Sequence, residues 1–213
     1  MFDYRSIVVH YEQCLAEHGD NHRGVDWPNP ADARKRYQVM LDVIRPNGPA
    51  NPSVLDFGCG ASHLLEYAQS KQQRLAYSGL DLSPHFIALS KAKFPQLPYY
   101  CLDILDKSAV WPQFDYIIAN GVFTEKRELS QQAMEQYFTA MLAGLFAHTK
   151  LGLAFNVMSS LVDWERADLF HVPFDAMARM LKAHASRDFV IRQDYGLYEY
   201  TVYVYRRQEA PEL

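Results

Sequence analysis

The sequence predicts an α/β fold with one mostly parallel sheet of seven strands and helices on both of its faces. From residue 53 onward, short apolar runs alternate with amphipathic stretches, a pattern typical of units in which a helix joins two parallel strands. Only residues 194–199 separate the last two apolar runs, so these two strands pair as an antiparallel hairpin. The sheet is therefore expected to be parallel except at its C-terminal hairpin.

The expected strands are the apolar runs at residues 54–57, 75–81, 99–102, 116–119, 151–157, 189–193 and 200–205. A helix is expected directly after residue 81, because Ser83 can cap it and Pro84 suits its first turn. A longer helix is expected from about residue 131 to residue 148, with large apolar side chains along one side. A short helix follows from Pro173 to about residue 183.

The N-terminal part of the chain is expected to be helical. Ile7, Val8, Tyr11 and Leu15 fall on one helical face, and a second helix is expected from about residue 30 to residue 44. Prolines and a glycine between residues 45 and 52 then break the helical pattern. We expect residues 1–50 to form a helical cover that belongs to the same domain as a core of residues 51–213.

Composition and charge are those of an ordinary globular protein. The chain has 213 residues, of which 49% are hydrophobic and 22% charged, enough for one domain with a substantial core. The net charge of -4 argues against nucleic acid as a partner. Cys14, Cys59 and Cys101 form no C-x-x-C pair, which predicts neither disulfides nor a metal site.

Without a signal-like start or a bilayer-length apolar run, we expect a cytoplasmic protein with no membrane partner. Nothing in the sequence specifies an oligomeric state.

The most informative motif runs from Val54 to His63, where an apolar strand ends in Asp56 and enters a glycine-flanked turn. Gly58 and Gly60 lack a Cβ, so the backbone can bend sharply and a ligand can lie against it. In open α/β sheets, ligands bind at the carboxyl ends of the strands. Candidate ligand-binding residues are therefore the polar residues that end the later strands, which are Asp81, Asp103 and Asn120.

These acids favour a ligand that contains adenosine. Asp81 follows the glycine turn at a spacing suited to the hydroxyls of an unphosphorylated ribose. Asp103 can accept a hydrogen bond from an exocyclic amine such as that of adenine, with Leu102 and Ile104 beside the ring. Each acid taken alone could equally be a turn or cap residue, and Asp106 is an alternative to Asp103.

Two adenosine-containing cofactors fit this pattern, a nicotinamide dinucleotide and S-adenosylmethionine. A dinucleotide turn has a third glycine at the position where this chain has His63. The segment from Val54 to Gly60 resembles instead the first motif of class I S-adenosylmethionine-dependent methyltransferases, which have an acid two residues before the first glycine. The segments 79–83 and 114–120 resemble the second-strand acid motif and the fourth strand of that family. Ser62 departs from the Gly-x-Gly-x-Gly form of many members.

The resemblance implies a Rossmann-like fold over about residues 53–206 and S-adenosylmethionine as the cofactor, with S-adenosylhomocysteine as its product. It also implies which residues bind this cofactor. The loop of Gly58, Cys59 and Gly60, oriented by Asp56, would approach the methionine portion. The other implied contacts are Asp81 with Leu82 at the ribose, Leu102, Asp103 and Ile104 around the adenine, Asn120 near the sulfonium, and Arg36 at the cofactor carboxylate.

Candidates for catalysis follow the fourth and fifth strands. His171 follows the fifth strand, and because imidazole is a side chain that can exchange protons near neutral pH, it is a candidate general base, with a structural loop histidine as the alternative. Asn156 could contact a polar substrate or satisfy neighbouring backbone groups. Glu125, Lys126 and Arg127 could contact the substrate or form a solvated turn.

We therefore expect a methyltransferase that passes the methyl group of S-adenosylmethionine to a small polar metabolite by in-line displacement. The length of the chain favours a small-molecule acceptor over nucleic acid. Two alternatives stay open. One is a catalytically silent methyltransferase-like protein that binds the cofactor or serves as a scaffold, and the other is a nicotinamide-dependent oxidoreductase.

Overall fold

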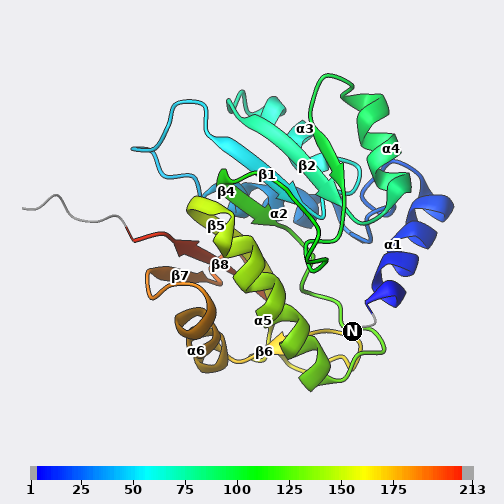
Figure 1. Ribbon diagram of the computed structural model, residues 1–213. Helices are drawn as coiled ribbons and strands as arrows, with labels where there is room; N and C mark the ends of the chain where they lie inside the picture. The colour runs from blue at the N-terminus through cyan, green and yellow to red at the C-terminus, as the bar shows by residue number, and fades with distance from the viewer. Residues whose placement is uncertain (1–3, 208–213) are drawn as a thin grey trace, which may run out of the picture.

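A mixed sheet of eight strands forms the centre of the molecule in the computed structural model, which describes residues 4–207 (Figure 1). Its strands run in the order β3-β2-β1-β4-β5-β8-β7, and the short β6 pairs with β5. The strand bounds are β1 Ser53–Phe57, β2 Ala76–Asp81, β3 Tyr99–Cys101, β4 Phe114–Ala119, β5 Thr149–Ser159, β6 His171–Val172, β7 Phe189–Arg192 and β8 Glu199–Tyr205. The predicted Rossmann-like fold with an antiparallel C-terminal hairpin is confirmed, since among the strands of residues 4–207 only β8 pairs antiparallel with its neighbours, β5 and β7.

The strand order creates a point where the chain changes direction across the sheet. From β1 the chain proceeds outward to β2 and β3, and it then returns to place β4 on the other side of β1. The loops that follow the neighbouring strands β1 and β4 therefore lead in opposite directions across the sheet. Open α/β sheets bind ligands at the position where two such loops separate. The glycine turn follows β1 and Asn120 follows β4, so both segments lie at this position.

Six helices accompany the sheet in the described part of the chain: α1 Arg5–His18, α2 Pro30–Leu41, α3 His63–Ser70, α4 Pro84–Lys93, α5 Gln131–Ala147 and α6 Phe174–His184. Local sequence explains where several of them begin. The Ser83 hydroxyl accepts a hydrogen bond from the Phe86 amide, with Pro84 in the first turn of α4, as the sequence predicts. Asn29 caps α2 and Ser130 caps α5 in the same way.

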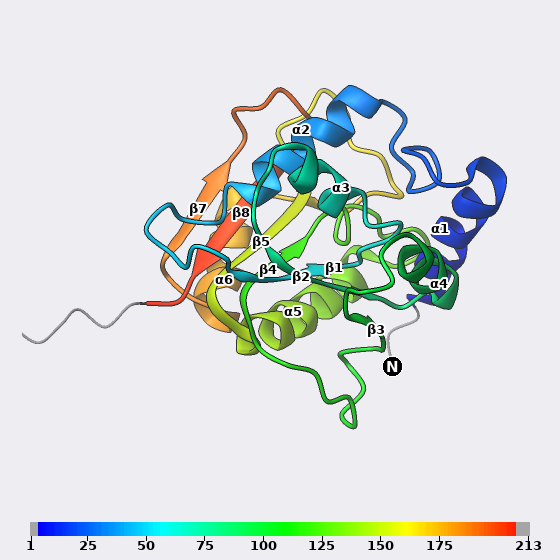
Figure 2. The same cartoon turned by 90° about the horizontal axis from the view of Figure 1, so that it is seen from above.

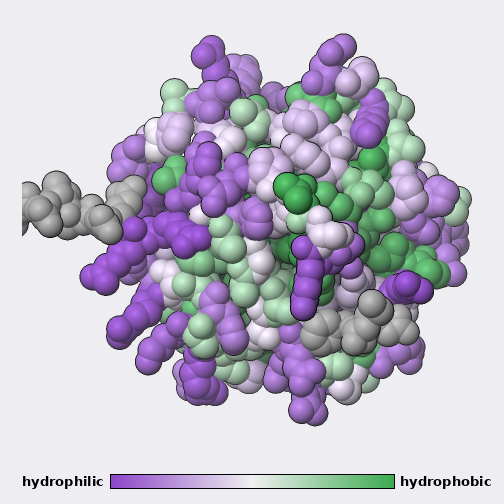
Figure 3. Space-filling view, viewed as in Figure 1, coloured by the Kyte–Doolittle hydropathy of each residue, from purple (hydrophilic) through white to green (hydrophobic). Residues whose placement is uncertain are grey.

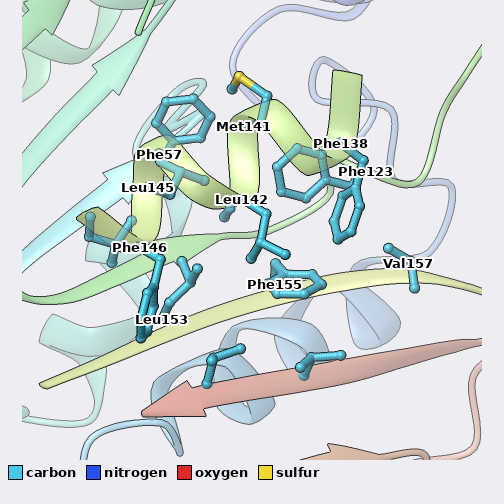
Figure 4. Close-up of a cluster of buried hydrophobic side chains, with 14 of the residues drawn as sticks. Phe57, Phe123, Phe138, Met141, Leu142, Leu145, Phe146, Leu153, Phe155 and Val157 are labelled. Carbon is cyan, nitrogen blue, oxygen red and sulfur yellow. The ribbon is translucent and has the colours of Figure 1, made fainter. Parts of the chain in front are cut away.

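Successive side chains along each strand point to opposite faces of the sheet, so the core is divided between these two faces. Leu55 and Phe57 pack with α5 and α6 on one face, whereas Val54 packs with α2 and α3 on the other. Figure 4 shows the α5 side of this core, where Phe123, Phe138 and Phe155 lie close together. The helices thus cover both faces, and Figure 2 shows α2 and α3 on the opposite side of the sheet from α5.

Apart from shifts of one or two residues at the ends of several other strands, three differences between the structure and the sequence expectations have a clear local cause. β5 extends to Ser159 rather than ending at residue 157, because its last residues pair with β6. The strand β6 itself was not predicted, since two residues carry no periodic pattern. Helix α2 ends at Leu41 rather than at residue 44, and the amides of Val43 and Ile44 instead make turn-type bonds to Met40 and Leu41.

Helix α1 differs from the other described helices in that it contributes no buried side chain to the core. It has no buried residue, and it lies beside α4 in both ribbon views (Figures 1 and 2). The space-filling view shows hydrophobic side chains on the side of the molecule where α1 and α4 lie, and mostly hydrophilic side chains on the other side (Figure 3). Among residues 4–207, no helix combines the length and the apolar character needed to cross a bilayer.

Candidate functional site

The turn between β1 and α3 is shaped by three residues with positive φ: Gly58 at 70°, Gly60 at 49° and Ser62 at 60°. A Cβ on Gly58 would lie 2.6 Å from Val122 Cγ2, so both the conformation and the space at this position require glycine. Ser62 adopts the left-handed conformation at the position where the resembling family often has a third glycine. Its fully buried hydroxyl bonds to Ser90 and to Tyr99, at 2.8 and 2.9 Å, and these bonds hold the turn without that glycine.

Asp81, at the end of β2, joins this turn to the neighbouring strand. Its Oδ2 accepts a hydrogen bond from the Gly60 amide, and its Oδ1 accepts one from the Ser83 amide, both at 2.9 Å. Burial raises the pKa of the carboxyl above its ordinary value, and the backbone hydrogen bonds oppose that rise. Asp81 and Leu82 both line a cavity at the carboxyl ends of the strands.

Asp56, at the end of β1, is almost completely buried beneath the same turn. Its Oδ2 accepts a hydrogen bond from the Tyr77 hydroxyl at 2.8 Å. Burial raises the pKa of Asp56 to about 7, the Tyr77 bond lowers it, and the nearby Asp81 raises it further. Within residues 4–207, no backbone amide of the glycine turn donates to Asp56, so its implied action on the loop through such a bond is not seen.

The cavity beside this turn is largely apolar and takes residues from several parts of the chain. The glycine turn and the end of β2 form one side, and the turn after β4 forms another, with Asn120, Gly121 and Val122. Asn120 Oδ1 is buried there and has no hydrogen-bond partner among residues 4–207. The remaining walls come from α1 and the segment after it, with Tyr4, Ile7, Val8, Tyr11, Val25 and Trp27, and from Tyr37, His63, Leu64, Phe86 and Tyr137. We call this the apolar cavity.

The predicted adenine contacts do not line the apolar cavity in this structure. Asp103 Oδ2 accepts a hydrogen bond from the Tyr4 hydroxyl, and its Oδ1 accepts one from the Leu105 amide at 2.9 Å. The Tyr4 ring lines the cavity and stacks on Tyr137, with ring centroids 5.1 Å apart. Leu102 and Ile104 pack against the α5 side of the core instead. Tyr4 therefore stands between Asp103 and the cavity, which the sequence did not indicate.

A second cavity lies next to the first, and Trp27 lines both of them. We call it the polar cavity, because four arginines, two histidines and three acids contribute to its walls. Its lining residues are His10, His18, Arg23, Asp26, Trp27, Pro28, Arg36, Thr124, Glu125, Arg127, Met158, Arg166, Leu169 and Glu199. The Trp27 ring also packs on the turn after β4, since a Cβ on Gly121 would lie 2.7 Å from Trp27 Cζ2. The turn after β4 and Trp27 thus contribute to both cavities.

Arg36 and Asn156 belong to one buried network rather than to the apolar cavity. Arg36 donates from Nε to both carboxylate oxygens of Glu199 at 2.9 Å, and its guanidinium lies 4.2 Å from the Trp27 ring centre. Asn156 Nδ2 donates to Glu199, also at 2.9 Å, and Asn156 Oδ1 accepts from the Gly121 amide at 2.7 Å. The prediction that Arg36 meets a cofactor carboxylate is not supported, because Glu199 already pairs with it. Asn156 fixes the turn after β4 instead of lining either cavity.

The prediction of His171 as a general base is also not supported. The side chain is buried in β6, where Nδ1 donates to the Ser159 carbonyl at 2.7 Å and Nε2 accepts from the Arg166 amide at 3.3 Å. Both ring nitrogens are therefore used by the backbone, and His171 lines neither cavity. The structural alternative describes this residue correctly.

A cluster of His10, Cys14 and Asp26 was not anticipated, because its members come from α1 and from the loop that follows it. Their potential metal-ligand atoms all lie within 4.8 Å of one another. His10 Nε2 and Asp26 Oδ2 are hydrogen bonded at 2.7 Å, and Cys14 Sγ lies 3.7 Å from His10 Nε2. Arg127 Nη2 lies 3.7 Å from Asp26 Oδ2, so a guanidinium already supplies positive charge at this acid.

Comparisons with known proteins agree with this geometry. Residues 55–144 match the sequence model of a family described as a methyltransferase domain. A Mycobacterium tuberculosis protein whose name describes it as a candidate methyltransferase is 29% identical over 157 residues, which are 71% of this chain and 92% of that protein.

Two solved methyltransferases share the fold at low sequence identity. Magnesium protoporphyrin IX methyltransferase from Synechocystis, with bound S-adenosylmethionine, has a TM-score of 0.64 at 15% identity and covers 97% of this chain and 99% of its own. The 1,6-didemethyltoxoflavin N1-methyltransferase of Burkholderia thailandensis has a TM-score of 0.62 at 16% identity, covering 96% and 90%. Together with the glycine turn and Asp81, these matches show that the chain has the fold of the class I S-adenosylmethionine-dependent methyltransferases and contains a segment similar to a methyltransferase domain.

Proposed function

We propose that this methyltransferase transfers the methyl group of S-adenosylmethionine to a small polar metabolite. The observation that carries this proposal is the pair of adjoining cavities, one apolar and one polar, with Trp27 lining both. Methyl transfer needs two reactants side by side, and a common boundary between two binding sites provides that arrangement. The apolar cavity would hold the cofactor and the polar cavity would hold the acceptor.

The residues of the apolar cavity fit S-adenosylmethionine. The Asp81 carboxylate can accept hydrogen bonds from the hydroxyls of a ribose. Gly58 and Gly60 have no side chain, and a Cβ on Gly58 would clash with Val122 Cγ2. The backbone of the turn is therefore bare, and a ligand can lie against it. Asn120 Oδ1 is a buried acceptor that receives no hydrogen bond from the described part of the chain, as expected where a ligand ammonium group supplies the missing bond. The cofactor would supply a methyl group activated by positive sulfur.

The N-terminal segment supports the idea of a cover over the apolar cavity. Ile7, Val8 and Tyr11 of α1 line the cavity, although α1 has no buried residue of its own. The helix is tied to the loops at the strand ends by few polar contacts, including Ser83 Oγ to Glu12 Oε1 at 2.6 Å. We propose that residues 1–50 belong to the same domain as the core and that α1 closes over bound cofactor.

The polar cavity supports a small polar acceptor. Its walls are rich in charged side chains, which would hold a molecule that has polar groups of its own. Small acceptors also occur among proteins of this fold, since the Burkholderia enzyme was solved with bound 1,6-didemethyltoxoflavin. The protein would contribute mainly by aligning the two reactants, an effect worth roughly 7 to 11 kcal/mol in favourable cases.

Transfer of a deuterated methyl group tests this function. The protein is incubated with S-adenosyl-L-[methyl-d3]methionine and a bacterial cell extract, which is then separated into a small-molecule and a macromolecular fraction for mass spectrometry. We expect label in the small-molecule fraction that depends on the protein. Label confined to protein or nucleic acid, or no label in either fraction, would contradict the proposal.

A further inference from the structure

Glu125 has an unusual environment in the turn after β4. The residue is only 9% exposed, and it lines the polar cavity. Its backbone pairs with Leu169 in an isolated bridge, which fixes the residue between the turn and the segment before β6. The sequence left two possibilities open for Glu125, a contact with the substrate and a solvated turn, and the burial of this carboxylate argues against the solvated turn.

The Glu125 carboxylate is poorly satisfied by the protein. Its Oε2 is buried without a hydrogen-bond partner, and within residues 4–207 its one ion-pair partner is Arg127, whose Nε lies 3.0 Å from Oε2 without the alignment of a hydrogen bond. Burial raises the pKa of Glu125 above its ordinary value, and Arg127 lowers it. A buried carboxylate short of donors is costly unless a bound ligand donates to it.

The same turn reaches both cavities. Asn120 enters the apolar cavity at its start, and Glu125 enters the polar cavity at its end. The turn between them is held by two bonds to the Gly121 carbonyl, one from Thr124 Oγ1 at 3.0 Å and one from the Tyr11 hydroxyl at 3.5 Å. Glu125 is close enough to Tyr11 to raise the pKa of that phenol, after the larger effect of burial. The carboxylate thus lies near the boundary across which a methyl group would pass.

We propose that Glu125 is the general base of the reaction and that the acceptor is a small molecule whose nucleophile is a hydroxyl or an amine. This assignment rests on the proposed function. The nucleophile uses a lone pair to bond the methyl carbon, the bond from that carbon to sulfur breaks, and its electron pair stays on sulfur. The proton of the nucleophile passes to the Glu125 carboxylate, which later releases it to water. A carboxylate acceptor needs no base and would be repelled by Glu125.

Glu125→Gln tests the base directly, because it keeps the shape of the side chain and removes its ability to take a proton. Wild type, Glu125→Gln and Glu125→Asp are compared in the deuterated-methyl assay with the small-molecule fraction of the extract. We expect label on oxygen or nitrogen, a loss of at least about 100-fold in Glu125→Gln and a smaller loss in Glu125→Asp. Glu128→Gln is the matched control, since Glu128 is exposed in the same segment, and its rate should match wild type.

The pH profile gives a second readout that a structural role would not produce. The titratable and charged groups that interact electrostatically with Glu125 are Arg127, Asp26, Asp168, His10 and Tyr11. A base works only when deprotonated, so the wild-type rate should rise with pH through a limb above the usual carboxyl range. Glu125→Gln should lack this limb. Asp26→Asn should retain it, shifted to lower pH, because Asp26 raises the pKa of Glu125.

Calorimetric titration with S-adenosylhomocysteine separates the possible failures. If the folded wild-type protein does not bind S-adenosylhomocysteine, the proposed function itself is contradicted. A wild-type protein that labels no small molecule would likewise contradict the proposed function. With wild-type transfer observed and binding within threefold of wild type in both Glu125 variants, two results would overturn the assignment of the base. These are undiminished transfer in Glu125→Gln and label found only on carboxylates or thiols.

Discussion

Asn156 Oδ1 accepts a hydrogen bond from the Gly121 amide at 2.7 Å, and this bond ties β5 to the turn that follows β4. The same side chain donates to Glu199, which is paired in turn with Arg36. The backbone of the turn is therefore held by a chain of buried polar groups that begins on α2. Because the turn contributes Asn120 to one cavity and Glu125 to the other, the network fixes both proposed binding sites relative to each other.

Arg36→Met should strongly destabilise the fold. The substitution leaves the Glu199 carboxylate, only 1% exposed, without its cation, and breaking a buried ion pair on one side costs about 3 to 5 kcal/mol. Urea denaturation should show a loss of this size. Arg34→Met on the same helix is the control, because Arg34 is exposed, and it should change stability by less than about 0.5 kcal/mol. Equal stabilities for the two variants would mean that the network does not hold the structure together.

Gly58→Ala should destabilise the protein by at least about 1 kcal/mol, since φ is 70° there and the new methyl group would meet Val122. Gly144→Ala is the contrasting change. Gly144 lies within α5 with only Ile104 Cδ1 near its missing Cβ, at 3.6 Å, so alanine should stabilise the helix by about 0.5 to 1 kcal/mol. Thermal melts of both variants show whether each substitution lowers or raises the stability of the protein. A destabilised Gly144→Ala would show that the space beside α5 is tighter than described.

Asp56→Asn should change how stability depends on pH. The folded pKa of Asp56 is about 7, whereas an unfolded aspartate titrates near 3.9. Between these values the folded protein holds a proton that the unfolded chain has released. The contribution of Asp56 to stability is therefore full below about pH 4 and is lost as pH rises to 7, by up to about 1.4 kcal/mol per pH unit.

Urea denaturation of wild type and Asp56→Asn between pH 5 and pH 8 measures this contribution as a difference. The stability of the variant relative to wild type should increase with pH and level off above about pH 7. A difference that stays constant over this range would show that Asp56 has an ordinary pKa in the folded protein.

Tyr4→Phe should speed the association of S-adenosylhomocysteine. In this structure the Tyr4 hydroxyl bonds to Asp103, and the Tyr4 ring lines the apolar cavity while Asp103 does not, so Tyr4 has to move before a ligand amine in the cavity reaches Asp103. Removing the hydroxyl should raise the association rate several-fold in stopped-flow fluorescence. Tyr198→Phe, at an exposed tyrosine, should leave the rate unchanged. An unchanged rate in Tyr4→Phe would mean that this contact does not limit entry.

The fold could be predicted well from the sequence because its signals are local. Each parallel strand is a short apolar run, and the helix after β2 begins with the capping residue Ser83 and Pro84. The two-residue strand β6 could not be predicted, since it exists only through pairing with the far end of β5. The end of α2 was also missed, because the apolar Ile44 continues the helical pattern beyond the last helical turn.

The site could be predicted only where its residues belong to a strand end. Asp81 and the glycine turn were found because each follows an apolar run, and the structure brings them together. Tyr4 was not found, since it reaches the cavity through long-range packing that leaves no local pattern. The same reason applies to Arg36 and His171, whose partners Glu199 and Ser159 are remote in sequence.

Calorimetric titration of S-adenosylhomocysteine into the wild-type protein and into Asp81→Ala tests the central claim most directly. The wild type should bind one equivalent, and Asp81→Ala should bind about 10- to 100-fold more weakly, as expected when hydrogen bonds to a charged group worth about 1.5 to 3 kcal/mol are lost. Asp163→Ala, at an exposed acid that lines neither cavity, should bind like wild type. Absence of binding to the folded wild type at high micromolar concentration, or an unchanged affinity in Asp81→Ala, would contradict this account of the cofactor site.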